Sequence, residues 1–165
     1  MSKGSFADMN CPIAQTLEQV GEWWSLLILR NAFCGMSQFQ DFQSHLGIST
    51  NILSQRLSQL VANDILTRQQ AADDGRVVHY HLTAKGQSLY PILAAMSVWG
   101  EQWVPHPQGP RMTIVASDTG KAISGVGIIA EDGRELRPDQ LDTVAGPGAD
   151  EKTHILMRMR METMK

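Results

Sequence analysis

Apolar residues recur at helical spacing near the start of the chain, and helix-breaking residues separate the repeats. Pro12 suits the first turn of a helix that runs to about Val20, with Ile13 and Leu17 on one of its faces. The stretch 23–33 is apolar on nearly all sides, which is typical of a buried helix at the centre of a small domain. The pattern therefore predicts two helices, the second of them central.

A tight connection over residues 46–49 joins two further amphipathic helices. Ser37 is suited to cap a short helix over 39–46, in which phenylalanine and leucine repeat at three- and four-residue spacing. Glycine in the connection ends this helix, and Ser49 is suited to cap the next one, over 50–63. Two helices joined by a short turn that contains glycine match the helix-turn-helix motif.

The second of these helices has an apolar stripe on one side and a polar face on the other. The inward stripe consists of Ile52 or Leu53, Leu57, Leu60 and Val61. The opposite face carries Asn51, Ser54, Gln55 and Ser58. In a helix-turn-helix, the second helix enters the major groove of DNA. Short hydroxyl and amide side chains suit the base edges there, and a glutamine can pair with adenine through two hydrogen bonds.

A hairpin and a long helix follow the helix-turn-helix. Residues 65–68 and 77–82 are expected to form strands, joined by the Asp-Gly turn signal of residues 73–76. Thr83 is suited to cap a last helix that runs from Ala84 to about residue 103. This order of elements predicts a winged helix-turn-helix, mainly α-helical with a small β-wing.

The remaining residues read as a linker and a small β-rich extension over 111–165. Three prolines and a glycine in residues 104–110 exclude a helix and indicate a linker. Residues 112–116 and 123–130 are apolar and β-branched, and residues 155–161 alternate between methionine and arginine. We therefore expect a small antiparallel sheet, to which the sequence assigns no role.

Composition is that of an ordinary folded domain. Hydrophobic residues make up 42% of the 165 residues and charged residues 19%, which excludes disordered, collagen-like and coiled-coil proteins. The net charge of −3 argues against a nonspecific polyanion binder. With no apolar run long enough for a bilayer, no signal peptide and no disulfide framework, a cytoplasmic, nucleoid-associated protein without membrane contact is expected.

With these elements in place, the sequence resembles the HxlR family of bacterial winged-helix regulators, which are relatives of the MarR type. The resemblance covers residues 10–103, the expected DNA-binding domain. It rests on Cys11-Pro12-Ile13, Trp24-Ser25-Leu26-Leu27-Ile28-Leu29-Arg30, Phe39-Gln40-Asp41-Phe42, Gly47-Ile48-Ser49, Leu53-Ser54-Gln55-Arg56-Leu57, Arg76-Val77-Val78-His79-Tyr80, Leu82-Thr83-Ala84-Lys85-Gly86 and Trp99-Gly100-Glu101. It implies that residues 49–58 form the DNA-reading helix, and it says nothing about residues 104–165.

The expected DNA contacts combine base edges with phosphates. The candidate residues are Ser49, Thr50, Asn51, Ser54, Gln55, Arg56, Ser58, Arg76 and Lys85. Arg56 is assigned to phosphate, Arg76 at the hairpin tip to phosphate or the minor groove, and Lys85 to a weaker phosphate contact. Family members commonly carry more basic residues along the reading helix, which predicts weaker nonspecific binding and a shallower salt dependence for this chain.

Apolar side chains on the first and last helices exceed what the domain needs for its own core. They are Ile13 and Leu17 on the first helix, and Leu93, Met96, Trp99 and Trp103 on the last. They predict a homodimer, and the two-fold symmetry of a dimer matches a palindromic operator in double-stranded DNA. An intramolecular core is the alternative.

The two cysteines have different expected roles. The resemblance implies that a cysteine just before the first helix, here Cys11, senses oxidants or electrophiles in some members, and a helix N-terminus favours the reactive thiolate. The alternative is that Cys11 is a small residue of ordinary reactivity. Cys34 is expected in the core, since free cysteine behaves as a small hydrophobe. A disulfide between the two stays open.

The main hypothesis is a homodimeric, sequence-specific transcriptional regulator, with repression by blocking polymerase as the simplest mechanism and a redox signal or small molecule as its effector. The alternative is a winged-helix protein-interaction module without DNA binding, which the acidic net charge and the uncharged Asn51 and Ser58 favour. No catalytic constellation or cofactor motif is present. His79 and His81 share a strand face but have no further metal ligand nearby, so neither an enzyme nor a metal site is expected.

Overall fold

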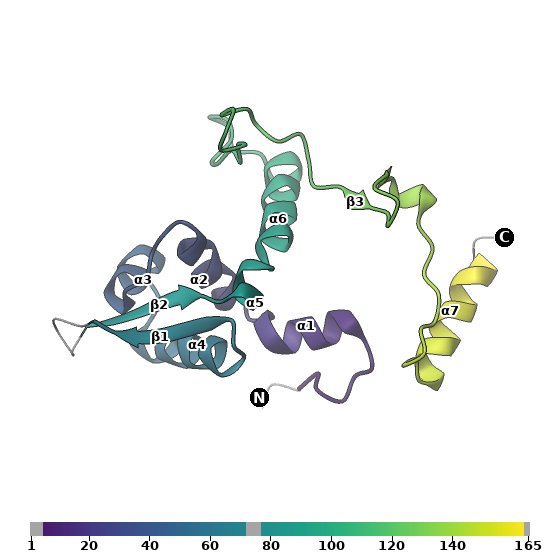
Figure 1. The fold of residues 1–165 in the computed structure, drawn as a ribbon, viewed down its shortest axis with the longest axis horizontal. Helices are drawn as coiled ribbons and strands as arrows, with labels where there is room; N and C mark the ends of the chain where they lie inside the picture. The colour runs from purple at the N-terminus through teal and green to yellow at the C-terminus, as the bar shows by residue number, and fades with distance from the viewer. Residues whose placement is uncertain (1–4, 72–76, 164–165) are drawn as a thin grey trace. The chain divides into compact units, whose positions relative to one another are not determined.

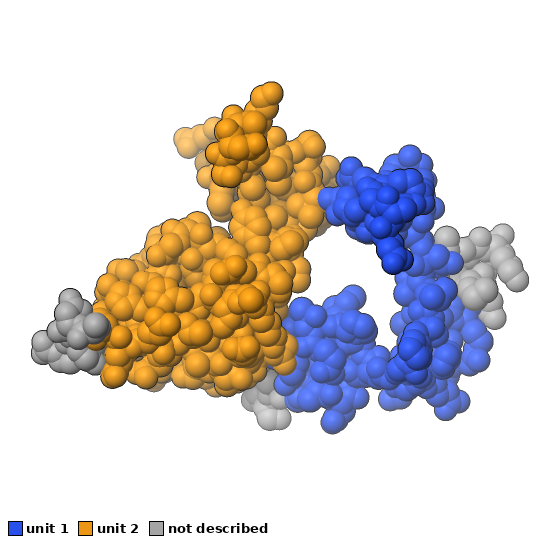
Figure 2. Space-filling model, viewed as in Figure 1, with its two compact units in different colours: residues 1–18, 127–165 blue, residues 19–126 orange. Residues whose placement is uncertain are grey.

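Contacts between residues divide the chain into two units, which Figure 2 colours separately. The computed structural model describes residues 5–71 and 77–163. One unit spans residues 19–126 and contains the helix-turn-helix, and the other combines residues 1–18 with residues 127–165. No helix in the described ranges has both the length and the apolar character that a membrane crossing requires.

Helix α2 (Trp23–Phe33) is the centre of the 19–126 unit, as the sequence predicts. Ile28 and Leu29 on this helix have no exposed surface. The other buried members of the same core are Val20, Phe42, Ile48, Leu53, Leu57, Leu60, Ile65 and Leu66. Helices α3 (Phe39–Leu46) and α4 (Thr50–Ala62) both pack on α2, so the helix-turn-helix is fixed to one central helix.

The wing is a two-stranded antiparallel sheet of β1 (Leu66–Gln70) and β2 (Val78–Leu82), joined at its base to α4 (Figure 1). Leu66 pairs with Leu82, and Gln70 pairs with Val78. A single bridge between Gln38 and His79 adds the segment before α3 to the free edge of β2. The predicted strands are therefore confirmed, and the turn over residues 73–76 lies outside the described residues.

Ser37 does not cap α3, which corrects the sequence prediction. The N-cap position belongs to Gln38, whose side chain makes no capping hydrogen bond. Ser37 precedes the N-cap position by one residue. Its backbone belongs to the edge of the sheet instead, because its carbonyl oxygen accepts a hydrogen bond from the Tyr80 amide at 2.7 Å. Its hydroxyl group lies 2.9 Å from His79 Nδ1. The serine therefore joins α3 to the wing.

The predicted last helix is divided in two. Helix α5 (Ala84–Gln87) begins at Thr83, whose hydroxyl accepts a hydrogen bond from the Gly86 amide at 3.0 Å, as a helix cap does. Helix α6 (Tyr90–Trp103) follows after a short turn. Pro91 explains the break, because proline has no N–H to donate to the preceding helical turn and is tolerated only in the first turn of a helix.

Helix α1 (Pro12–Val20) has the predicted bounds. The segment before it is folded back onto this helix. Gln15 Nε2 donates to the carbonyl oxygens of Phe6, Ala7 and Met9 at 2.8–3.2 Å, and Glu18 accepts a hydrogen bond from the Phe6 amide at 2.8 Å. Two side chains of α1 therefore hold the N-terminal turn.

The C-terminal residues contain less sheet than predicted. A single bridge pairs Val115 with Ala122, and β3 (Ile128–Ile129) pairs with β4 (Glu135–Leu136) before a 3₁₀ turn at Pro138–Gln140. The expected hairpin is thus reduced to short pieces.

The strand predicted over residues 155–161 is wrong, because this stretch belongs to helix α7 (Glu151–Thr163). Asp150 accepts hydrogen bonds from the backbone amide and the hydroxyl of Thr153, both at 2.8 Å, and so caps the helix. These bonds, the amide first, hold the pKa of the Asp150 carboxyl below its usual value. Glu, Leu, Met and Arg all favour helices, and the alternation of methionine and arginine is too short to outweigh this preference.

Gly86 gives a test of this packing. A Cβ at position 86 would collide with the backbone carbonyl oxygen of Ile65, which is held by the core. Gly86→Ala is expected to lower the free energy of unfolding by about 1–3 kcal/mol, measured by urea denaturation.

The matched control is Gly100→Ala, within α6. A Cβ there meets nothing within 4 Å, so this change is expected to stabilise the chain by about 0.5–1 kcal/mol through helix propensity. Equal effects of the two substitutions would contradict the close approach of α5 to the Ile65 backbone.

Candidate DNA interface

The turn between α3 and α4 is built by three consecutive residues. Gly47 adopts the left-handed conformation (φ 62°), which glycine reaches without strain, and its amide donates to the Gln43 carbonyl oxygen. Ile48 turns inward and is buried in the core. Ser49 then caps α4 by accepting from the Ile52 amide at 3.4 Å. The predicted roles of Gly47 and Ser49 are confirmed.

Helix α4 presents the polar face that the sequence predicts. Leu53, Leu57 and Leu60 are buried against the rest of the core, which settles the choice between Leu53 and Ile52 at the start of the stripe. The exposed residues of α4 include Ser49 at the cap and Thr50, Asn51, Ser54, Gln55 and Ser58. This surface carries hydroxyl and amide groups and no formal charge.

A residue that the sequence analysis missed, Gln43, supports the start of α4. Its Nε2 atom donates to the hydroxyl of Thr50 at 2.8 Å, across the turn. The bond connects α3 directly to the first turn of α4. The sequence does carry a signal for this contact. Gln43 is a polar residue that lies four positions before Gly47, so its side chain can reach across the connection between α3 and α4.

Arg56 lies on the side of α4 and not on its exposed face. Its Nη2 atom is 3.3 Å from Glu22 Oε2, and the two side chains are only 16% and 25% exposed. Glu22 occupies the N-cap position of α2, where a negative charge is favoured by the helix dipole. The ion pair therefore joins α4 to the beginning of the central helix.

Lys85 is placed at the opposite end of α4 from the turn. Its Nζ atom donates to the carbonyl oxygen of Asn63, the C-cap residue of α4, at 2.7 Å and to Gln19 Oε1 at 3.3 Å. A cation is favoured at a helix C-terminus because it pairs with the unsatisfied carbonyl groups. Lys85 therefore lies at the C-terminal end of α4, away from Ser49 and Asn51, which lie together at the N-terminal end of this helix.

The wing contributes a charge that the sequence analysis did not single out. Arg68 is exposed on β1, opposite Tyr80 in the sheet register. The Ala71 amide still donates to the Val77 carbonyl oxygen at 2.9 Å, so the hairpin pairing continues beyond the two strands. Arg76, assigned to the wing tip, lies outside the described residues.

The two cysteines do not follow the expected division. Cys11 is half-buried immediately before α1, and its carbonyl oxygen accepts from the Gln15 amide. Cys34 is exposed, which contradicts its assignment to the core. It stands at the C-cap of α2, and Gly35 then turns the chain away with a φ of 92°, so the side chain is carried past the buried part of the helix.

The apolar residues expected at a dimer interface are mostly exposed. On α6, Met96, Trp99 and Trp103 are exposed, Trp99 by 61% and Trp103 by 65%, while Leu93 is half-buried against the core. On α1, Ile13 and Leu17 are exposed. Two exposed tryptophan side chains on one helix, here Trp99 and Trp103 of α6, are unusual for a surface that contacts only water.

Comparisons with known proteins agree with this geometry. The model of the HxlR-like helix-turn-helix family matches residues 19–108. The uncharacterized HTH-type transcriptional regulator Rv3095 of Mycobacterium tuberculosis is 32% identical over 136 residues, which are 82% of this chain and 86% of that protein. Because this alignment is longer than the segment 19–108, the similarity includes residues outside the family model.

Solved structures extend the comparison to the fold. The crystal structure of PA1607, a candidate transcription factor, is 34% identical with a TM-score of 0.78 and covers 87% of this chain and 100% of that chain. The redox regulator HypR in its oxidized form is 30% identical with a TM-score of 0.52, covering 56% of this chain and 96% of its own.

The pair of Arg56 and Glu22 can be tested as a structural contact. We expect Arg56→Met to lower the free energy of unfolding by up to about 1 kcal/mol, because the pair is partly exposed to solvent and screened. A double-mutant cycle with Glu22→Gln, followed by urea denaturation, isolates the pairwise energy. A coupling energy of zero would show that Arg56 does not hold α4 to α2.

Proposed function

The chain belongs to the HxlR-like helix-turn-helix family of transcriptional regulators, and on that premise we propose that it binds a palindromic DNA operator as a homodimer and represses transcription by occupying it. The observation that carries the proposal is the exposed polar face of α4, because its apolar face is buried against the core and its hydroxyl and amide groups are left to the solvent. Repression needs only that the bound dimer blocks polymerase.

In this proposal, sequence is read from the major groove by Asn51, Ser54, Gln55 and Ser58. Amide and hydroxyl side chains form hydrogen bonds with base edges, and Gln55 is suited to adenine. Ser49 and Thr50 lie at the positive end of the helix, where a backbone phosphate is favoured. The bond from Gln43 to Thr50 supports this role because it fixes the first turn of α4.

Three basic side chains are the candidates for contacts with phosphate. Arg76 is proposed to contact phosphate or the minor groove from the hairpin. Arg56 is proposed to contact phosphate after exchanging its partner Glu22 for the DNA, and Lys85 is the weakest candidate because it caps the far end of α4. With few such contacts, binding is expected to depend less steeply on salt than in proteins with a basic reading helix.

The homodimer is proposed from the exposed apolar side chains. Trp99, Trp103 and Met96 on α6 and Ile13 and Leu17 on α1 are the candidates for the interface. Burial of these apolar side chains against a second copy of the chain would remove them from water, which stabilises the dimer through the hydrophobic effect. A dimer places two recognition helices about one turn of DNA apart, roughly 34–36 Å, which is the reason for expecting a palindrome.

Gln55→Ala tests the proposed contact with bases. We expect the substitution to weaken operator binding by about 10- to 100-fold and to change binding to unrelated DNA little, because a base contact adds specificity and not general affinity. The operator is first selected from genomic fragments bound by the purified protein, and Kd is then measured by fluorescence anisotropy over a range of salt concentrations.

Gln59→Ala is the matched control. Gln59 is also an exposed glutamine on α4, but its side chain donates to Asn63 at the C-terminal end of the helix, so operator affinity is expected to stay unchanged. If no fragment with two-fold symmetry is enriched, or if Gln55→Ala binds the operator as well as the unsubstituted chain, specific DNA binding through this face is wrong. The polar face would then be a candidate for contact with a protein.

We further propose that Cys11 makes DNA binding sensitive to oxidants. HypR, a similar protein, is a redox regulator, and this supports the proposal without assigning the residue. The neighbouring residue Asn10 adds a local reason. Its side chain donates to the Gly148 carbonyl oxygen at 2.8 Å, and its carbonyl oxygen accepts from the Thr153 hydroxyl at 3.3 Å. A larger, oxidised sulfur at Cys11 would disturb this attachment of the C-terminal residues.

Hydrogen peroxide gives the test. It is expected to lower the operator affinity of the unsubstituted chain and of Cys34→Ser, and to leave Cys11→Ser unaffected, as measured by anisotropy before and after treatment with a thiol reductant. Cys34→Ser is an informative control because Cys34 is the more exposed cysteine. Release of oxidised Cys11→Ser from DNA would assign the response to another residue.

A further inference from the structure

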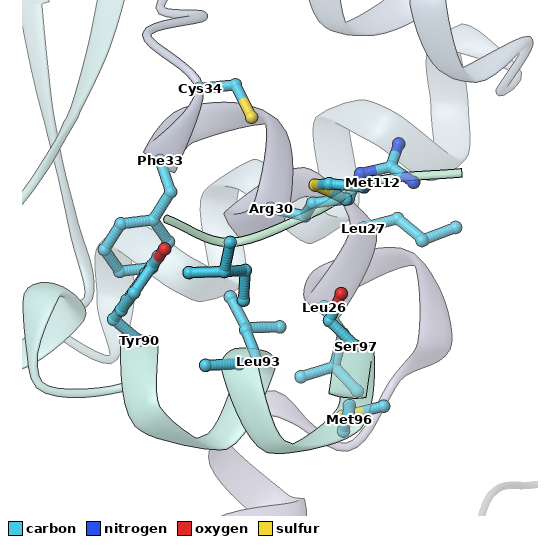
Figure 3. Close-up of a pocket in the computed structure, with 12 residues that line it drawn as sticks. Leu26, Leu27, Arg30, Phe33, Cys34, Tyr90, Leu93, Met96, Ser97 and Met112 are labelled. Carbon is cyan, nitrogen blue, oxygen red and sulfur yellow. The ribbon is translucent and has the colours of Figure 1, made fainter. Parts of the chain in front are cut away.

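A pocket of about 310 Å³ lies between α2 and α6 within the 19–126 unit (Figure 3). Residues of the segment that follows α6, among them Met112, cover part of it. Its volume is at the lower end of the range for small-molecule sites, which points to a small ligand.

The wall of the pocket is mostly apolar, and its polar groups include the Arg30 guanidinium and the hydroxyl groups of Tyr90 and Ser97. In Figure 3, the rings of Phe33 and Tyr90 lie at one side, packed edge to face with centroids 4.9 Å apart, and the Arg30 guanidinium lies at the other. Leucine and methionine side chains, which adapt to the shape of a ligand, form most of the rest. Arg30 is the only charged residue among the described residues that line the pocket.

Arg30 is held in place but lacks a negative partner. Its Nε and Nη2 atoms donate to the side-chain oxygen of Asn31 at 3.1 and 2.9 Å. No carboxylate in residues 5–71 or 77–163 pairs with it, and the remaining N–H groups of the guanidinium are left for another acceptor. A cation beside an apolar wall is costly without a partner, and a carboxylate matches the guanidinium through two parallel hydrogen bonds.

We propose that this pocket binds a small amphipathic anion, a molecule with a flexible apolar chain and one carboxylate, such as a medium-chain carboxylic acid. The chain occupies the leucine- and methionine-lined space towards Phe33 and Tyr90, and the carboxylate pairs with Arg30. The neutral end of the pocket excludes a second charge, so a dianion is disfavoured.

The residue that holds Arg30 also contacts the helix-turn-helix. Asn31 is buried, and its Nδ2 atom lies 2.9 Å from His45 Nδ1 on α3. Since the Asn31 oxygen faces Arg30, its amide nitrogen donates to His45. Helix α3 in turn holds the first turn of α4 through Gln43 and Thr50. A carboxylate bound to the remaining N–H groups competes with the Asn31 oxygen for the same guanidinium and so loosens this connection, and operator affinity is expected to fall; this part rests on the proposed DNA binding.

Isothermal titration calorimetry of the full chain with octanoate, n-octanol and octylammonium tests the site. Octanoate is expected to bind more tightly than the neutral and the cationic analogue. Arg30→Met keeps the apolar stem and removes the charge, so octanoate should bind about 10- to 100-fold more weakly while octanol is unaffected. Arg134→Gln, an exposed arginine outside the pocket, should change neither.

Ser97→Phe gives a second variant that leaves Arg30 in place. It fills part of the pocket and should weaken octanoate and octanol alike. The proposal is overturned if octanoate does not bind below its micelle-forming concentration, if it binds no better than octanol and octylammonium, or if Arg30→Met, folded by circular dichroism, binds it as well as the unsubstituted chain. Should Arg30→Met fail to fold, the comparison of the three analogues on the unsubstituted chain decides.

Operator binding with and without octanoate separates this inference from the proposed function. A several-fold loss of operator affinity in the unsubstituted chain, absent in Arg30→Met, supports the connection through Asn31. Unchanged affinity overturns the connection and leaves the ligand site. A chain that binds octanoate but no operator overturns the proposed function and not the pocket.

Discussion

The burial of one face of α4 against α2 is the interaction on which the rest of the structure depends. Leu53, Leu57 and Leu60 repeat at helical spacing, and their burial leaves only one rotation of α4 about its own axis. The polar residues must then face the solvent. Gly47 and Ile48 fix the entry to the helix, the first by its left-handed backbone and the second by its buried side chain. The polar face of α4 is thus a consequence of packing, and at its start Ser49 caps the helix while Thr50 accepts the bond from Gln43.

Charged side chains near α4 act mainly on the helix itself. Arg56 joins its middle to the start of α2, and Lys85 caps its C-terminal end. The exposed face is therefore left with hydrogen-bonding groups, which discriminate between bases, and with little of the electrostatic attraction that binds DNA of any sequence. In the proposed function, base contacts are therefore expected mainly from α4, and charged contacts with phosphate mainly from the wing.

The parts of the fold that the sequence predicts are those with a long hydrophobic repeat or an unambiguous terminus. The bounds of α1 and α2, the cap at Ser49 and the two strands of the wing are of this kind. Errors arise where tertiary contacts compete with a local preference. Ser37 is drawn into the sheet edge by its bond with Tyr80. The break before α6 has a local cause instead, because Pro91 interrupts a continuous apolar repeat. The partners of Arg56 and Lys85, which are Glu22 and Asn63, lie close to them only after folding, so the sequence could not predict these bonds, and the phosphate contacts of both side chains stay predictions.

Helix α2 packs against the helix-turn-helix and also lines the pocket. Successive residues of an α-helix point about 100° apart, so Arg30 and Asn31 face different neighbours although they are adjacent in sequence. Arg30 lines the pocket, and Asn31 is buried towards α3. A ligand shifts an equilibrium only by the difference in its affinity for two states, and the two hydrogen bonds between these side chains supply such a difference. The anion proposed for the pocket is thus within one turn of α2 of the bond that connects this helix to α3, and α3 in turn contacts the proposed DNA-reading helix.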